Sequence, residues 1–143
     1  LPQVAAFDPA QVPAPAALPV PMDDADSAVP LVRLAVARSG DKGNHSNIGV
    51  MARKPEYLAW IAAALTPEAV AQWMAHTLDA EQGRVSRWYL PGSHSLNFLL
   101  ENALGGGGVA SLRIDPQGKA FAQQLLEFPV PVARAVLEKG QHP

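Results

Sequence analysis

The stretch ARSGDKGNHSN, residues 37–47, gathers polar and flexible residue types directly after an apolar run. Backbone N–H groups of a glycine-rich turn that follows a strand can form a concave nest for an anion. Basic side chains would add charge there, asparagines can both donate and accept hydrogen bonds, and Asp41 is a candidate base. An ordinary solvated turn explains the same residues equally well. The residues predicted to bind the anion are Arg38, Ser39, Gly40, Lys42, Gly43, Asn44 and Asn47.

Three familiar glycine motifs do not describe this stretch. Its lysine precedes the second glycine, so it is not a Walker A loop, and no G-x-G-x-x-G dinucleotide fingerprint is present. The letters GDKG match the G-x-x-G of a KH domain, but that loop joins two helices and belongs to a basic domain. Here it follows a predicted strand in a chain of net charge -2.

A second glycine-rich stretch, LGGGGVASLR, covers residues 104–113. Four consecutive glycines are more than the end of a helix requires, and each costs about 0.5–1 kcal/mol in a regular element relative to alanine. We therefore expect close approach of this backbone to a ligand or to residues 37–47; a flexible connector is the alternative. Gly106, Gly107 and Arg113 join the predicted binding set.

The stretch LPGSHSLNF, residues 90–98, places a histidine between two serines at a predicted helix start. His94 is therefore the second candidate for proton transfer beside Asp41, and Asn97 is predicted to orient a bound group. The alternative is a serine cap beside a surface histidine. No G-x-S-x-G elbow is present, which disfavours a hydrolase serine. The four histidines lack metal-ligand spacing, so neither a metal nor a cofactor is predicted.

The elements that would position these residues follow from hydrophobic periodicity. Strands are predicted over residues 31–37, 47–52, 85–90 and 109–114. Helices are predicted to begin at Pro55, at Thr66-Pro67, at Ser93 (ending at Leu104), and after a turn at 115–118 (ending at Phe128). This order predicts an α+β two-layer sandwich, with helices on one face of a small mixed four-stranded sheet.

Composition limits the domain count and the class of partner. A length of 143 residues fits one domain, and the pI of about 6.1 argues against nucleic acid or an anionic membrane as partner. The absence of cysteine fits a reducing compartment, so a cytoplasmic location is expected. Half of the 14 prolines lie in the first 30 residues. We expect a proline-rich linker or tail over 1–30, a domain over 31–128 and a C-terminal extension over 129–143.

Several motifs in fixed order resemble one family. SGDKGN, NIGV, LNF, LGGGG, SLR and QGK, spread over residues 31–126, look like the C-terminal domain of the acyclic terpene utilisation protein A (AtuA-like) family. The resemblance implies a ferredoxin-like fold and a larger N-terminal domain or subunit as partner. It also implies a place in the breakdown of acyclic terpenes such as citronellol and geraniol through branched acyl-CoA intermediates.

Two functions remain open on this basis. The first is part of an enzyme, of the hydratase, lyase or carboxylase-associated type, whose glycine-rich loops bind an acyl-CoA or another anionic small molecule. The second is a non-catalytic module for oligomerisation or for docking a larger N-terminal domain, with Trp88 and Tyr89 at the interface. A homo-oligomer is expected in either case.

Overall fold

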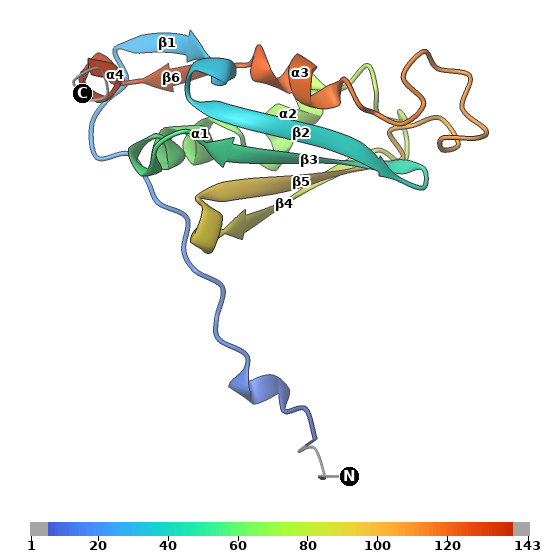
Figure 1. Ribbon diagram of the computed structural model, residues 1–143, viewed down its shortest axis with the longest axis horizontal. Helices are drawn as coiled ribbons and strands as arrows, with labels where there is room; N and C mark the ends of the chain where they lie inside the picture. Colours follow the sequence, from blue (N-terminus) through green and yellow to red (C-terminus); the bar gives the residue numbers. More distant parts are fainter. Residues whose placement is uncertain (1–5, 139–143) are drawn as a thin grey trace.

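The computed structural model describes residues 6–138, most of which form a two-layer sandwich (Figure 1). One layer is a four-stranded sheet in the order β2-β3-β5-β4, in which every pairing is antiparallel. Its strands are β2 (Ala35–Lys42), β3 (His45–Ala52), β4 (Arg84–Leu90) and β5 (Ser95–Glu101). The α+β two-layer sandwich is thereby confirmed, but the sheet is antiparallel, whereas a mixed one was expected.

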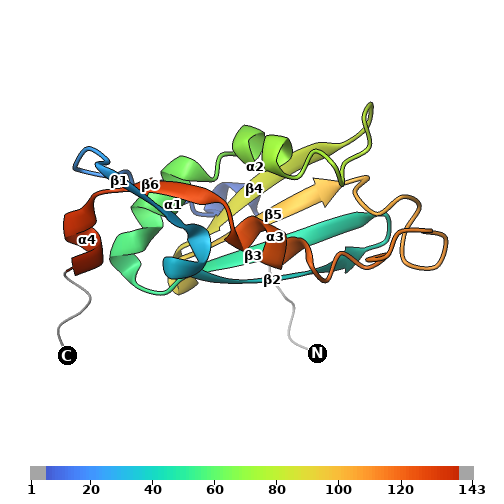
Figure 2. The same ribbon diagram turned by 90° about the horizontal axis from the view of Figure 1, so that it is seen from above.

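Helices form the second layer and cover one face of the sheet, as the view from above shows (Figure 2). They are α1 (Leu58–Ala64), α2 (Pro67–Trp73) and α3 (Phe121–Leu126). The strands alternate accordingly: Leu96, Phe98 and Leu100 of β5 are fully buried, while the residues between them lie on the other face. The core therefore lies between sheet and helices, and the opposite face of the sheet stays uncovered.

A short two-stranded ribbon extends the fold beyond both ends of the 31–128 range. Strand β1 (Ser27–Pro30) pairs with β6 (Pro129–Val132), and Val130 and Val132 are fully buried. Helix α4 (Arg134–Glu138) follows β6. Before β1, the chain runs away from the sandwich towards its N-terminus (Figure 1). Short 3-10 turns complete the structure: η1 (Pro9–Gln11), η2 (Leu31–Arg33), η3 (Pro55–Tyr57) and η4 (Pro91–Ser93).

Several sequence predictions match these elements. Strands cover the predicted ranges 47–52 and 85–90, and α2 begins at Pro67 as expected. The Thr66 hydroxyl accepts the Ala69 N–H at 3.1 Å, which is the predicted N-cap. Within residues 6–138, no helix is long and apolar enough to cross a membrane.

Three predicted elements are wrong. The predicted strand 31–37 is wrong for residues 31–34: Leu31 belongs to the turn η2, Leu34 directly follows that turn, and the strand begins only at Ala35. The predicted helix from Ser93 to Leu104 is instead the turn η4 followed by β5, because alternate burial of its apolar residues against β3 outweighs their helical spacing. The predicted strand over 109–114 is irregular backbone that pairs with no strand of residues 6–138.

Candidate functional site

The stretch 37–47 is mostly strand and forms the β2–β3 hairpin, which corrects its interpretation as a loop. Lys42 pairs with His45 and Asp41 with Ser46, so only two residues make the turn. Gly43 has φ +65°, a conformation that glycine adopts without the steric cost of a Cβ. The polar residues before it therefore lie in fixed register along the edge strand β2.

A pocket of about 450 Å³ opens at the edge of β2. Six of the predicted site residues line it, together with two residues that the sequence did not single out. The lining residues are Arg38, Ser39, Gly40, Asp41, Lys42, Asn47, Gly49 and Lys119. The hairpin thus supplies seven of the eight, and the segment before α3 supplies the last.

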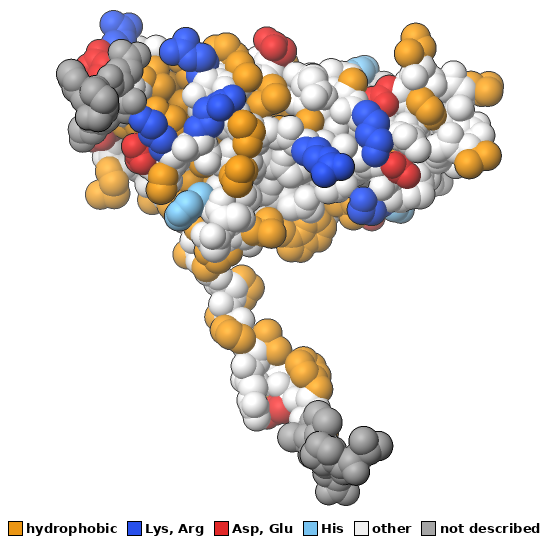
Figure 3. Space-filling view, viewed as in Figure 1, with side chains coloured by type: hydrophobic (Ala, Val, Ile, Leu, Met, Phe, Trp, Pro, Cys, Tyr) orange, Lys and Arg blue, Asp and Glu red, His pale blue; other side chains and the backbone are white. Residues whose placement is uncertain are grey.

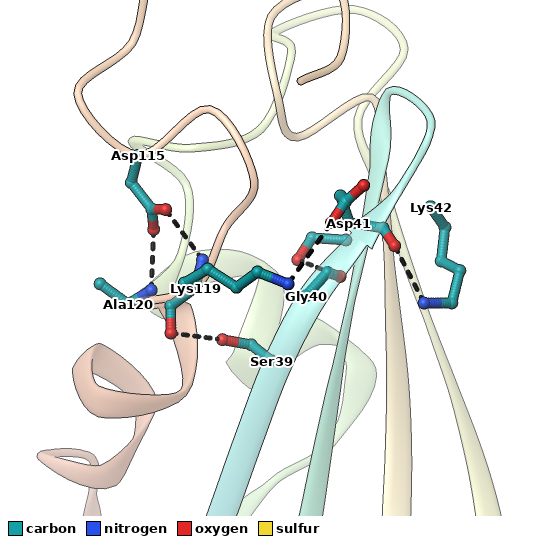
Figure 4. Close-up of polar contacts among 8 residues, drawn as sticks. Ser39, Gly40, Asp41, Lys42, Asp115, Lys119 and Ala120 are labelled. Atoms are coloured by element: carbon teal, nitrogen blue, oxygen red, sulfur yellow. Dashed lines mark hydrogen bonds and ion pairs between the residues drawn. The ribbon is translucent and has the colours of Figure 1, made fainter. Parts of the chain in front are cut away.

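Positive charge dominates the pocket, which contains three basic side chains and one carboxylate. Lys119 extends from the segment before α3 to β2, and its Nζ lies 3.5 Å from Asp41 Oδ1 (Figure 4). A Cβ on Gly40 would lie 3.2 Å from that same Nζ, so the glycine lets the ammonium lie close to the strand backbone. Lys42 Nζ donates to the Asp41 carbonyl at 2.9 Å. Within residues 6–138, no group pairs with the Arg38 guanidinium, which stays available to an anion.

Ser39 lines the pocket but its hydroxyl already holds helix α3. Its Oγ accepts the Ala122 N–H at 3.0 Å and donates to the Lys119 carbonyl at 3.1 Å (Figure 4 shows the latter). The Asp115 carboxylate accepts the N–H groups of Lys119 and Ala120, both at 2.8 Å. The first amides of α3 are therefore satisfied within the protein and do not point at a ligand.

The glycine run lies against the hairpin turn, which confirms the predicted close approach of the two stretches. Gly106 N–H donates to Asn44 Oδ1 at 2.7 Å. A Cβ on Gly107 would lie 3.1 Å from the Gly43 carbonyl oxygen, so only glycine fits there without displacement. Asn44 also donates to Asn102 Oδ1 at 3.1 Å. These residues brace the tip of the hairpin beside the pocket and do not line it.

Arg113 is likewise a brace. Its Nη1 donates to the Thr77 carbonyl at 2.6 Å and to the Ala103 carbonyl. Its guanidinium thus ties the segment after the glycine run to the end of β5 and the segment after α2. It is not among the residues that line the pocket.

The two remaining predicted residues lie far apart, Asn97 on the uncovered face of the sheet and His94 in the turn between η4 and β5. Asn97 of β5 accepts from Asn47 Nδ2 at 3.3 Å and so lies beside the pocket. His94 lies at the opposite end of the sheet, where it precedes Ser95 and its carbonyl accepts the Ala52 N–H. Six residue steps along β3, from Ser46 opposite Asp41 to Ala52 beside His94, separate the two places by about 20 Å at roughly 3.3 Å per residue. His94 and Asp41 are therefore not brought together.

Lys119 and Gly49 are the pocket residues that the sequence reasoning missed. Lys119 is the last residue of the QGK motif, so the family motif already contained a signal for this lysine. A Cβ on Gly49 would have the Arg38 carbonyl oxygen as its nearest neighbour, at 3.9 Å. The missing side chain therefore leaves a hollow on the uncovered face. Among residues 6–138, no three His, Asp or Glu side chains lie close enough to hold a metal ion.

Comparison with known proteins shows to which family the chain belongs. No curated protein and no solved structure matches it. The model of the AtuA ferredoxin-like domain matches residues 29–131, from β1 to β6, and so covers the sandwich, the hairpin and the glycine run. The match confirms the resemblance seen in the motifs, and the chain belongs to the AtuA ferredoxin-like domain family.

Proposed function

We propose that this domain binds the anionic group of a branched or terpenoid acyl-CoA intermediate, as part of an enzyme that acts on it. The observation that carries the proposal is the pocket at β2, where Arg38, Lys42 and Lys119 surround one cavity. A phosphate or carboxylate there would accept hydrogen bonds from these side chains. Charge-assisted bonds of this kind are roughly twice as strong as neutral ones.

The pocket offers one candidate for proton transfer. Asp41 lies among the lining residues, paired with Lys119 at 3.5 Å. An anion that draws Lys119 towards itself would weaken that pair and leave the carboxylate free to accept a proton. Asn47 and Asn97, joined by a hydrogen bond beside the pocket, would orient the bound group. A larger N-terminal domain would supply the remaining catalytic groups.

Calorimetry with coenzyme A, a branched acyl-CoA and inorganic phosphate tests the proposal. Arg38→Ala should weaken coenzyme A binding at least tenfold, since a hydrogen bond to a charged group contributes about 1.5–3 kcal/mol and about 1.4 kcal/mol corresponds to tenfold. Arg33→Ala is the matched control, because this exposed arginine lies outside the pocket and should change binding less than twofold. Equal effects of the two variants, or no binding of any of these anions, would contradict the proposal.

One observation favours the alternative, a docking module for a larger domain. Val109, Leu112 and Ile114 are fully exposed in the segment between β5 and α3, which protrudes at one end of the molecule (Figure 1). Three large apolar side chains together in water are typical of a surface that another protein covers. Hydrogen exchange of residues 108–114 tests this alternative: slower exchange in the presence of a larger domain, without coenzyme A binding at the pocket, is expected only for a docking module.

A further inference from the structure

The uncovered face of the sheet has an apolar end. Val36 of β2 lies opposite Met51 of β3, and Leu90 and Trp88 of β4 lie on the same face beyond β5, which separates β3 from β4. Each of the four side chains is between 38% and 51% exposed. We call these four residues the apolar patch. In Figure 3, hydrophobic side chains lie beside Lys and Arg side chains in the left half of this face. The patch lies at the opposite end of β2 from Lys42 and does not belong to the anion pocket.

The N-terminal arm, residues 6–26, has complementary properties. Its apolar side chains Phe7, Val12, Val20 and Met22 are 57% to 92% exposed. It carries four aspartates (Asp8, Asp23, Asp24 and Asp26), and the first 30 residues contain no lysine or arginine. Prolines keep such a segment extended, so that less conformational entropy is lost when it binds.

The charges around the patch are of the opposite sign. The exposed side chains of Arg33 and Arg53 lie at this end: Arg33 ends the turn η2 before β2, and Arg53 directly follows β3. Arg38 lies further along β2. Among the strand residues of the uncovered face, Glu101 is the only acid and it lies at the other end of the sheet. An acidic, apolar, extended segment is therefore the kind of partner that fits this surface.

The arm does not lie on the patch of its own chain. Its base, around Pro21 to Ala25, lies against Trp60, Ala63 and Ala64 of α1, on the helix-covered side of the sheet. From there the arm runs away from the molecule (Figures 1 and 3). It leaves at the same end of the sandwich that carries the patch, so a two-fold axis at this end would set the arm of each copy beside the patch of the other.

We propose that two copies of this chain exchange their N-terminal arms, each arm lying across the apolar patch of the other copy. The contact is reciprocal and closes as a dimer. The patch alone is too small, because a stable interface buries roughly 800 Å² per partner. The arm supplies the rest: 21 residues at about 3.1 Å each extend to about 65 Å, more than twice the length of the strands.

Sedimentation equilibrium tests the dimer and its charges. Met51→Glu should raise the dissociation constant at least tenfold, whereas Leu112→Glu, an equally apolar exposed position far from the patch, should leave it within twofold. Asp8→Lys, in the part of the arm that leaves the molecule, should also weaken the dimer, and adding Arg33→Glu should recover part of the loss. A monomer at every concentration, or equal effects of Met51→Glu and Leu112→Glu, would overturn the proposal.

A spin label tests which copy the arm touches. The chain contains no cysteine, so Ala14→Cys gives a single attachment site in the arm. In a mixture of labelled chains and ¹⁵N-enriched unlabelled chains, the amides of Val36, Met51 and Leu90 should broaden. Broadening that appears only when label and ¹⁵N are on the same chain would place the arm on its own patch and refute exchange. No broadening in either sample would refute it as well.

Discussion

Replacing Ser39 by alanine separates two roles for a residue that lines the pocket. The sequence placed Ser39 among the anion-binding residues. In the structure Ser39 is a buried residue, 7% exposed, and its hydroxyl makes two hydrogen bonds to the backbone around the start of α3. If those bonds are its function, Ser39→Ala lowers stability and leaves anion binding unchanged.

The magnitude follows from the two groups that lose their partner. The Ala122 N–H loses an acceptor that acts as a helix cap from a neighbouring strand, and loss of such a cap costs about 1 kcal/mol. The Lys119 carbonyl loses a donor in a partly buried place, at a cost of about 0.5–1 kcal/mol. No large cavity forms, because only an oxygen is removed. The sum is about 1.5–2 kcal/mol, or about 6 °C in Tm for a chain of this size.

Urea and thermal unfolding of Ser39→Ala measure this loss, with Ser86→Ala as the matched control. Ser86 lies on the edge strand β4 and its hydroxyl makes no hydrogen bond within residues 6–138, so its loss should stay within about 0.5 kcal/mol. Coenzyme A should bind Ser39→Ala within twofold of the unchanged protein. If Ser39→Ala unfolds like the control and loses the anion instead, Ser39 is a ligand and the assignment of its hydroxyl to α3 is wrong.

Three further substitutions test the braces of the fold. Asn44→Ala removes hydrogen bonds to the glycine run and should cost about 1–3 kcal/mol in urea unfolding, with amide shifts confined to the hairpin tip. Gly118→Ala should cost about 2–3 kcal/mol, because φ is +60° and the new Cβ would lie 2.6 Å from a serine hydroxyl; a loss under 0.5 kcal/mol would contradict the geometry. Hydrogen bonds from the backbone N–H of Gln82, and next from that of Glu81, lower the pKa of Asp79 from its ordinary value of 3.8. The ionised carboxylate therefore stabilises the fold above pH 3.8, and this stabilisation is lost as the pH falls through the pKa of the folded state. The stability difference between Asp79→Ala and the unchanged protein should therefore shrink as the pH falls below about 4.

Local patterns predicted the elements where only one period fits. The alternation of Ile48 and Val50 allows no helix, and the Thr66-Pro67 pair sets a helix start by capping chemistry alone. Residues 93–104 allow both periods, since leucines at helical spacing coincide with the alternating set Leu96, Phe98 and Leu100. Only the pairing of Phe98 with Ile48 on the next strand decides between them, and that contact is invisible in the local sequence.

The 109–114 segment shows a different limit. Its alternating apolar residues satisfy the strand pattern, yet Val109, Leu112 and Ile114 are exposed and the segment pairs with no strand of residues 6–138. Hydrophobic periodicity indicates that one face of a segment is to be buried, but it does not identify the part of the protein, or the partner, that buries it. When the surface that covers such a segment lies outside the folded unit, the sequence keeps its alternating pattern although no strand forms. The docking alternative rests on these three residues for that reason.

The predicted site residues fall into two groups, those that line the pocket and those that brace the fold. The contacts that separate the two groups cannot be read from the residue types. Arg38 and Arg113 are chemically identical, but Arg113 donates to two carbonyls whereas Arg38 has no partner within residues 6–138. A guanidinium that is already satisfied contributes to stability, and one that is free can bind an anion. The pocket and brace residues should therefore separate on two measurements: Arg38→Ala should lower affinity at constant Tm, and Arg113→Ala should lower Tm at nearly constant affinity, since its loss leaves the Thr77 and Ala103 carbonyls without their donor. If both variants lose affinity and stability in proportion, the pocket and its braces act as one unit and the division is wrong.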